Sequence, residues 1–126
     1  MTDFTPWRLL LCDDDPDMLR LMSGHFSHLG HEVHQATNGR ECLTTWDAVR
    51  PDVTVLDIDM PEMTGMQALP ELRRRGASVI MLTGRSQIEL ALSALKEGAE
   101  NYLVKPTEMT HLEVMVRRAV DRIRQR

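Results

Sequence analysis

Two apolar segments of the 126-residue chain run directly into carboxylates. The run LLLC is followed by Asp13, Asp14 and Asp15, and the run VTVL is followed by Asp57 and, two residues on, by Asp59. Neighbouring carboxylates repel one another, and the repulsion grows where apolar surroundings lower the local dielectric. If the fold brings these carboxylates together, they need a cation among them, and an all-oxygen site with few carboxylates favours Mg²⁺ over Ca²⁺.

Two further apolar segments end in side chains that bind anionic oxygens. Thr83 and Gly84 follow one of them, and Lys105 and Pro106 follow the other. Beside a bound Mg²⁺, a carboxylate can attack phosphorus and form an acyl phosphate. Lys105 would then neutralise a phosphoryl oxygen, while the Thr83 hydroxyl and the Gly84 backbone N–H would donate to the others. The residue types therefore indicate phosphoryl chemistry at a site assembled from several segments.

The elements that must position these residues are expected to be five short strands, each followed by a helix. Apolar, often β-branched runs predict strands at 8–13, 31–36, 53–58, 79–83 and 101–104. Helical spacing and end signals predict helices at 15–29, 39–49, up to about residue 75, 87–97 and 112–123. Asp15 is expected to be the N-cap of the first helix. Pro70 implies that the third helix begins late, near Leu69, or has a distorted first turn.

Apolar strands that alternate with amphipathic helices are typical of a parallel sheet covered on both faces. With right-handed crossovers, five such units predict a doubly wound α/β domain, a (βα)5 fold with a five-stranded parallel sheet in the flavodoxin-like order 2-1-3-4-5. Ligand sites in this class lie beyond the carboxyl ends of the strands, here between the first and third. One domain is expected over residues 1–126, with a core at about 8–124 and residues 1–7 as a lead-in.

The composition of the chain argues against several classes of function. The net charge of -4, the pI near 5.7 and the aromatic content of 4% argue against direct nucleic-acid binding, which favours a basic surface or a stacking platform. Cys12 and Cys42 are too few for a disulfide framework and are expected to be reduced, buried thiols of a cytoplasmic protein. No secretory signal and no run of transmembrane length is found, so no membrane partner is expected.

At the predicted strand ends, the sequence resembles the receiver domain of two-component response regulators. The likeness covers roughly residues 8–124 and rests on the fragments CDDD, VLDIDMPEMTG, MLTG and YLVKP, which stand in the order of the family. The resemblance implies a CheY-like domain that accepts a phosphoryl group from a sensor histidine kinase or a phosphotransfer protein. The reaction would depend on Mg²⁺ or Mn²⁺, and the domain would be no enzyme beyond its own phosphorylation and dephosphorylation.

The resemblance also assigns roles to the acidic positions. It implies that Asp57 is the phosphoacceptor and a metal ligand, and that Asp13 and Asp14 are the metal-binding pair. The backbone carbonyl of Asp59 would be a further ligand. Asp59 and Arg85 occupy positions that tune dephosphorylation in the family.

The remaining matches concern the phosphoryl group and the switch. Thr83 corresponds to the switch hydroxyl, Tyr102 to the switch aromatic, and Lys105 to the lysine of the site, with a cis peptide expected between Lys105 and Pro106. The last two helices and the fifth strand would form the face that binds an effector domain or protein, and phosphorylation could produce a homodimer. Thr107 departs from the family, which usually has Phe there.

Parts of the sequence also permit other interpretations. The fragment DIDM resembles the nucleophile motif of Mg²⁺-dependent haloacid-dehalogenase-like phosphatases, which would make Asp57 a catalytic nucleophile, but here the acidic pair precedes that strand. A flavin-binding module is disfavoured because the first loop is Asp-Asp-Asp, which repels phosphate. The histidines at 25, 28, 31 and 34 are regularly spaced, but Gly30 interrupts them, so solvated imidazoles are expected.

Overall fold

A computed structural model describes residues 4–125 and contains one five-stranded parallel sheet in the order β2-β1-β3-β4-β5. The strands are β1 (Arg8–Cys12), β2 (Glu32–Ala36), β3 (Val53–Asp57), β4 (Val79–Thr83) and β5 (Asn101–Val104). The helices are α1 (Pro16–His28), α2 (Gly39–Val49), α3 (Gly65–Arg74), α4 (Ile88–Lys96) and α5 (Met109–Arg124), and a 3₁₀ turn, η1 (Arg85–Gln87), precedes α4. The predicted fold class and strand order are confirmed.

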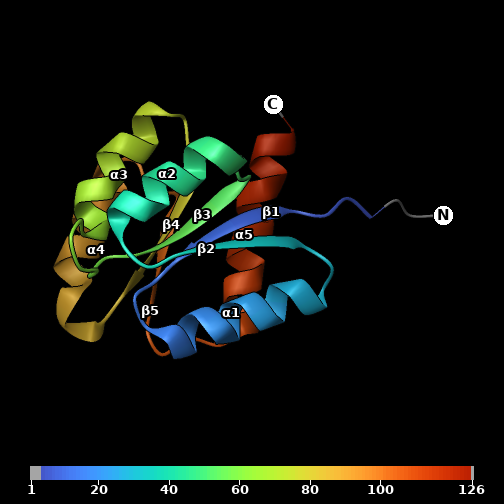
Figure 1. Cartoon of the computed structure of the whole chain (residues 1–126). Helices are drawn as coiled ribbons and strands as arrows, with labels where there is room; N and C mark the ends of the chain where they lie inside the picture. Colours follow the sequence, from blue (N-terminus) through green and yellow to red (C-terminus); the bar gives the residue numbers. More distant parts are fainter. Residues whose placement is uncertain (1–3, 126) are drawn as a thin grey trace.

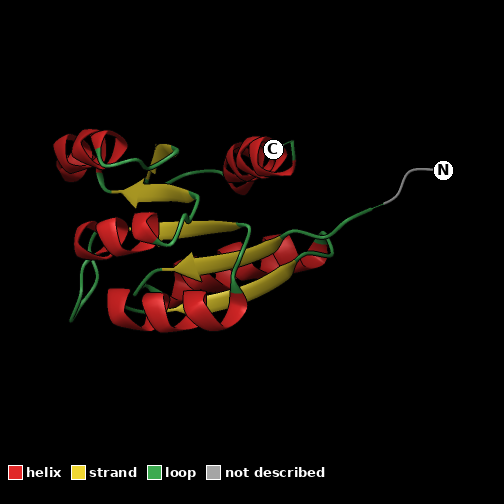
Figure 2. Ribbon diagram, turned by 90° about the horizontal axis from the view of Figure 1, so that it is seen from above, coloured by secondary structure: helices red, strands yellow, loops and turns green. Residues whose placement is uncertain are grey.

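Helices cover both faces of the sheet. Helices α1 and α5 lie on one face, and α2, α3 and α4 lie on the other (Figures 1 and 2). The strands alternate between the two layers because successive side chains point to opposite faces. In β1, Leu9 and Leu11 pack with α1 and α5, whereas Leu10 and Cys12 pack with α2, α3 and α4. All four side chains are fully buried, which explains why this strand is apolar throughout.

The strand ends that carry the site follow the prediction to within one residue. Asp13 and Ile58 lie just beyond β1 and β3, and each still donates one backbone hydrogen bond to the neighbouring strand, at 3.1 and 3.0 Å. His31 lies before β2 because its N–H donates to the Phe26 carbonyl and closes α1. At the start of α1, the Asp15 side chain accepts from the Asp17 N–H, so the predicted N-cap is confirmed.

The predicted start of α3 was wrong, whereas its predicted end at about residue 75 agrees with the structure to within one residue. This helix begins at Gly65 and not near Leu69, and its first turn is closed by a capping box between Thr64 and Gln67. Pro70 lies in the second turn, where it removes one hydrogen-bond donor from the helix. The capping box and the buried face of the helix outweigh this loss.

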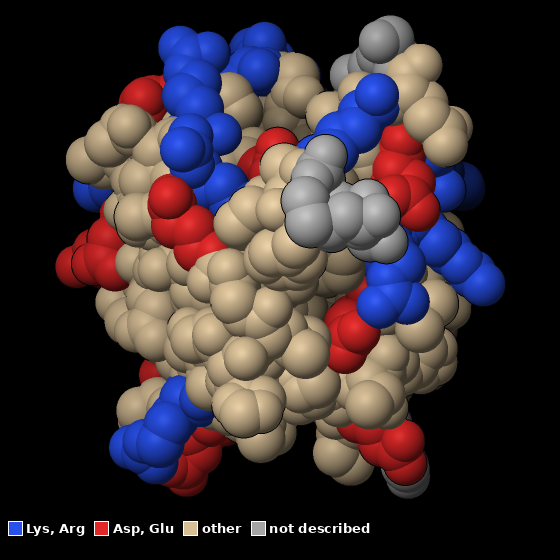
Figure 3. Space-filling view, turned by 90° about the vertical axis from the view of Figure 1, so that its right-hand side faces the viewer, with Lys and Arg blue, Asp and Glu red and all other residues tan. Residues whose placement is uncertain are grey.

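Charges of both signs surround the amino-terminal edge of the sheet, which Figure 3 faces. Arg8 pairs with Glu32 at 2.8 Å, and Arg124 of α5 lies 3.5 Å from Asp52. No single-sign patch therefore dominates the described part of this face. None of the helices within residues 4–125 has both the length and the apolar character needed to span a bilayer.

Candidate phosphoacceptor and metal site

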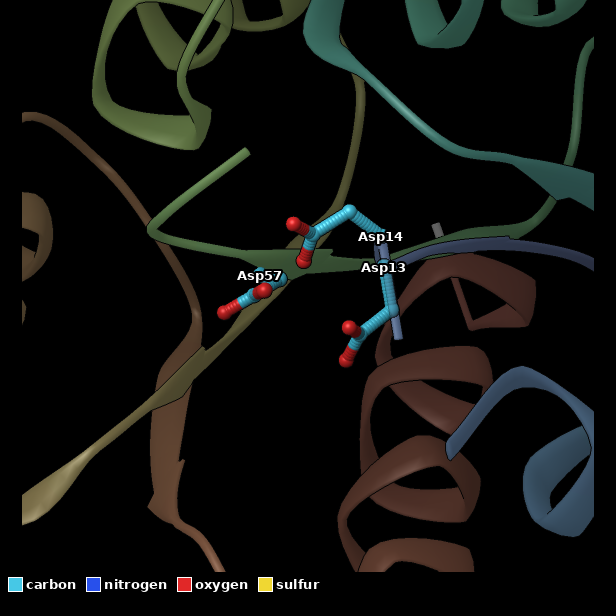
Figure 4. A group of neighbouring side chains, drawn as sticks. All are labelled: Asp13, Asp14 and Asp57. Carbon is cyan, nitrogen blue, oxygen red and sulfur yellow. The ribbon is translucent and has the colours of Figure 1, made fainter. Parts of the chain in front are cut away.

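Three carboxylates meet at the carboxyl ends of β1 and β3. Asp13, Asp14 and Asp57 each offer an oxygen atom within 4.8 Å of the others, and Figure 4 shows them around one space. The two strands are neighbours, with Cys12 paired to Leu56, so the residues that follow them must lie side by side. Asp13 and Asp57 are buried, whereas Asp14 is exposed. The sheet thus brings together Asp13 and Asp57, which are 44 positions apart in the chain.

Lys105 supplies the positive charge in this cluster. It follows β5, and its Nζ lies 2.6 Å from Asp13 Oδ2 and 3.5 Å from Asp57 Oδ2. The backbone N–H of Lys105 donates to the Thr83 carbonyl at 2.7 Å, which fixes the start of the turn. The Lys105-Pro106 peptide is cis, as expected. Four of the predicted site residues therefore lie within one cluster.

The charges of the cluster are unequally balanced. Burial raises the pKa of Asp57 from 3.8 to about 7, and the charge of Asp13 adds to this shift, while Lys105 opposes it. Burial disfavours the charged Lys105 ammonium, but the contact with Asp13 and the charge of Asp57 outweigh it, so the pKa of Lys105 is raised. The ammonium therefore stabilises the negative charge of Asp57 less than that of Asp13, to which it lies closer.

The donor set fits a hard divalent cation. Asp13 Oδ1 accepts a hydrogen bond of 2.9 Å from the Asp15 N–H, whereas Asp13 Oδ2 is buried and accepts no hydrogen bond of good geometry despite its close contact with Lys105. A buried carboxylate oxygen with a free lone pair, beside two further carboxylates, is suited to an oxygen-seeking ion such as Mg²⁺.

Gly65 allows the loop after β3 to fold back on the site, a role that sequence reasoning missed. Its N–H donates to the Ile58 carbonyl at 2.8 Å. A Cβ atom at this position would lie 2.0 Å from the Asp57 carbonyl oxygen. Sequence reasoning missed this role because the contact of Gly65 with Asp57 depends on the path of the loop.

Thr83 is the last residue of β4 and Asp59 follows β3, and each of the two side chains has a local partner. Thr83 is fully buried, and its hydroxyl donates to the Gly84 carbonyl at 3.0 Å. The Asp59 carboxylate lies outside the acidic cluster and accepts from Gln87 Nε2 at 3.0 Å. Gln87 Oε1 accepts from the Gly84 N–H at 3.4 Å, so Gln87 connects the loops after β3 and β4. No sequence pattern indicates the contact between Gln87 and Asp59.

Tyr102 packs against the core layer of α2, α3 and α4, and it lines a surface groove of about 960 Å³. Thr107 and Val114 line the same groove, which follows β5 and α5. Val114 is exposed, as are Ile88 and Leu92 of α4. The predicted output face therefore carries apolar side chains in contact with solvent.

The regularly spaced histidines form no cluster among the described residues. His25 contacts Glu113 at 2.9 Å and His34 contacts Glu32 at 2.8 Å. His31 accepts the N–H of Trp7 on Nδ1 at 3.0 Å. Three of the four imidazoles thus have separate partners.

Comparisons with known proteins agree with this geometry. A family model of the response regulator receiver domain matches residues 9–117. The chain is 39% identical over 115 residues to the regulatory protein AtoC of Escherichia coli, covering 90% of this chain and 25% of AtoC. It is 34% identical over 102 residues to the chemotaxis protein CheY of Thermotoga maritima, covering 79% of this chain and 85% of CheY. The crystal structure of the receiver domain of NtrX from Brucella abortus matches with a TM-score of 0.85 and 29% identity, covering 90% of this chain and 98% of that one.

The chain spans about half the length or less of most curated relatives that it matches, and most of the length of CheY. These matches give no support to the alternative of a haloacid-dehalogenase-like phosphatase. The chain belongs to the receiver domains of two-component response regulators.

Proposed function

We propose that Asp57 is the residue of this receiver domain that accepts the phosphoryl group. The observation that carries the proposal is the cluster of three carboxylates with Lys105 at the carboxyl ends of the strands. A carboxylate oxygen of Asp57 attacks the phosphorus of a phosphohistidine on a histidine kinase or a phosphotransfer protein. The P–N bond breaks, the imidazole leaves, and an acyl phosphate remains on Asp57.

The neighbouring residues neutralise the negative charge of the phosphoryl group during this reaction. Asp13, Asp14, Asp57 and the Asp59 backbone carbonyl would hold Mg²⁺ or Mn²⁺, which supplies charge neutralisation of the phosphoryl oxygens. Lys105 moves its ammonium from the carboxylates to a phosphoryl oxygen. Apart from this self-phosphorylation and the loss of the phosphoryl group by hydrolysis, the domain performs no catalysis.

The output of the domain would pass through the face formed by α4, β5 and α5. The Thr83 hydroxyl turns from the Gly84 carbonyl toward the phosphoryl group, and Tyr102 changes its position on the groove beside α5. The exposed apolar residues Ile88, Leu92 and Val114 then bind an effector domain or protein, or a second copy of the chain. We place these events in the cytoplasm, where histidine kinases present their phosphohistidine.

Phosphorylation with acetyl phosphate, with and without Mg²⁺, tests the assignment. Intact mass should show one added phosphoryl group on the wild type only when Mg²⁺ is present, and none on Asp57→Asn. The variant Asp15→Asn is the matched control because it makes the same chemical change at an exposed N-cap, where Asn caps as well as Asp. Modification that needs no metal, or that persists in Asp57→Asn, would refute the proposal.

A further inference from the structure

Two buried cysteines lie in direct contact beneath the acidic cluster. Cys12 is the last residue of β1, and Cys42 lies in the first half of α2. Their Sγ atoms are 3.0 Å apart, and both residues are fully buried. The phosphoryl chemistry uses neither thiol.

The separation of the sulfurs is within about 1 Å of the ~2.05 Å length of a disulfide. Backbone pairing to Ala36 on one side and Leu56 on the other fixes Cys12 in the interior of the sheet. Cys42 lies on α2, which packs against the outside of the sheet, so α2 can shift, or the Cys42 side chain can rotate, more easily than Cys12 can move. Formation of the S–S bond therefore requires movement mainly of α2.

We propose that Cys12 and Cys42 are a redox modification site, at which two-electron oxidation forms an intramolecular disulfide between β1 and α2. The oxidant belongs to the class of hydroperoxides. When α2 opens locally, the Cys42 thiolate attacks the peroxide oxygen and becomes a sulfenic acid, while the alcohol or water leaves. The Cys12 thiolate then attacks the Cys42 sulfur, the S–S bond forms and water leaves. One hydroperoxide is reduced and the two thiol hydrogens are lost.

Burial determines the rate of this reaction. Both thiols are fully buried, so a hydroperoxide reaches neither of them in the closed fold. Oxidation is therefore slow and limited by the opening of α2. The same burial protects the product, because a reducing thiol must also wait for α2 to open.

The disulfide would connect two parts of the phosphoryl site. Cys12 directly precedes Asp13. At the start of α2, the Gly39 N–H donates to the Met63 carbonyl at 2.8 Å, and a Cβ atom on Gly39 would lie 2.6 Å from that oxygen. Helix α2 thus packs tightly on the loop that follows Asp57, and a shift of α2 must reach this loop. This consequence rests on the proposed function, whereas the formation of the disulfide does not.

The test is oxidation of the whole folded chain with hydrogen peroxide, followed by unfolding in a maleimide without reductant and measurement of the intact mass. We expect a monomer that takes up no maleimide and has lost two hydrogen atoms, with peptides containing Cys12 and Cys42 joined. Cys12→Ala and Cys42→Ala, each of which keeps a small apolar side chain, should not form this product. Dithiothreitol should restore the thiols much faster in urea than in buffer.

If either variant fails to fold, the maleimide labelling and intact mass of the oxidised wild-type protein are sufficient to test the proposal. Two maleimide-labelled thiols after oxidation of the native protein, or only disulfides between chains, would overturn it. Equally rapid reduction in buffer and in urea would overturn the assignment to a buried pair. Loss of phosphorylation in Asp57→Asn has no bearing on these outcomes, so failure of the disulfide and failure of the phosphoacceptor assignment are told apart.

Discussion

Replacement of Asp57 by Asn should stabilise the metal-free protein, and the gain should depend on pH. The pKa of Asp57 is raised from 3.8 to about 7, first by burial and then by the charge of Asp13. The folded state therefore holds a proton that the unfolded chain has released between about pH 4 and pH 7. In the wild type this contribution to stability is full below about pH 4 and is lost as the pH rises through about 7.

The size of the effect follows from the two pKa values. The difference between 3.8 and about 7 corresponds to roughly 4 kcal/mol. Asparagine has almost the shape of aspartate but no charge to desolvate, so it avoids this cost. The variant should be more stable than the wild type by roughly 4 kcal/mol at about pH 8, and by a fraction of that at about pH 4.5.

Urea denaturation in the presence of a chelator, repeated across this pH range, measures the difference directly. Asp15→Asn controls for the loss of one negative charge, because Asp15 is an exposed N-cap outside the cluster. Equal differences between Asp57→Asn and the wild type at both ends of the pH range would refute the reasoning. Addition of Mg²⁺ at about pH 8 should stabilise the wild type more than the variant, since the ion favours the ionised carboxylate.

Further predictions concern residues that contact Asp13 and Asp57. Lys105→Met leaves the buried Asp13 carboxylate without its cation and should lower the free energy of unfolding by about 3 kcal/mol, measured by urea denaturation. Gly65→Ala places a Cβ atom against the Asp57 carbonyl and should cost about 3 kcal/mol, with a large fall in Tm. Gly24→Ala is its control, because Gly24 lies on the exposed side of α1 with no atom near the added Cβ, so Tm should rise by the equivalent of about 1 kcal/mol. A fall in Tm for both glycine variants would contradict this account.

The position of the site could be predicted because it depends on the topology of the sheet. Apolar runs located the strands, and a parallel sheet brings all their carboxyl ends to one edge. Asp13, Asp57 and Lys105 were therefore expected together although no local pattern joins them. Their mutual distances agree with that expectation.

Features that depend on side-chain packing were not predictable in this way. The contact of Cys12 with Cys42 depends on how α2 rotates over the sheet, and both thiols fit the pattern of ordinary core residues. The close approach of Gly65 to Asp57 depends on the path of the loop after β3, which no local sequence pattern indicates. Pro70 misled the prediction of α3 because its unfavourable local effect is outweighed by a capping box and by burial.

The raised pKa of Asp57 links metal binding to proton release. Burial and the charge of Asp13 raise this pKa to about 7, and the Lys105 ammonium, which lies closer to Asp13, opposes the shift only in part, so Asp57 takes up a proton near neutral pH in the metal-free state. A divalent cation requires the carboxylate, and its binding at about pH 6 must therefore expel close to one proton, whereas at about pH 8 it expels almost none. Calorimetric titration with Mg²⁺ in buffers of different ionisation enthalpy measures this number. A binding enthalpy independent of the buffer at the lower pH would contradict the raised pKa of Asp57.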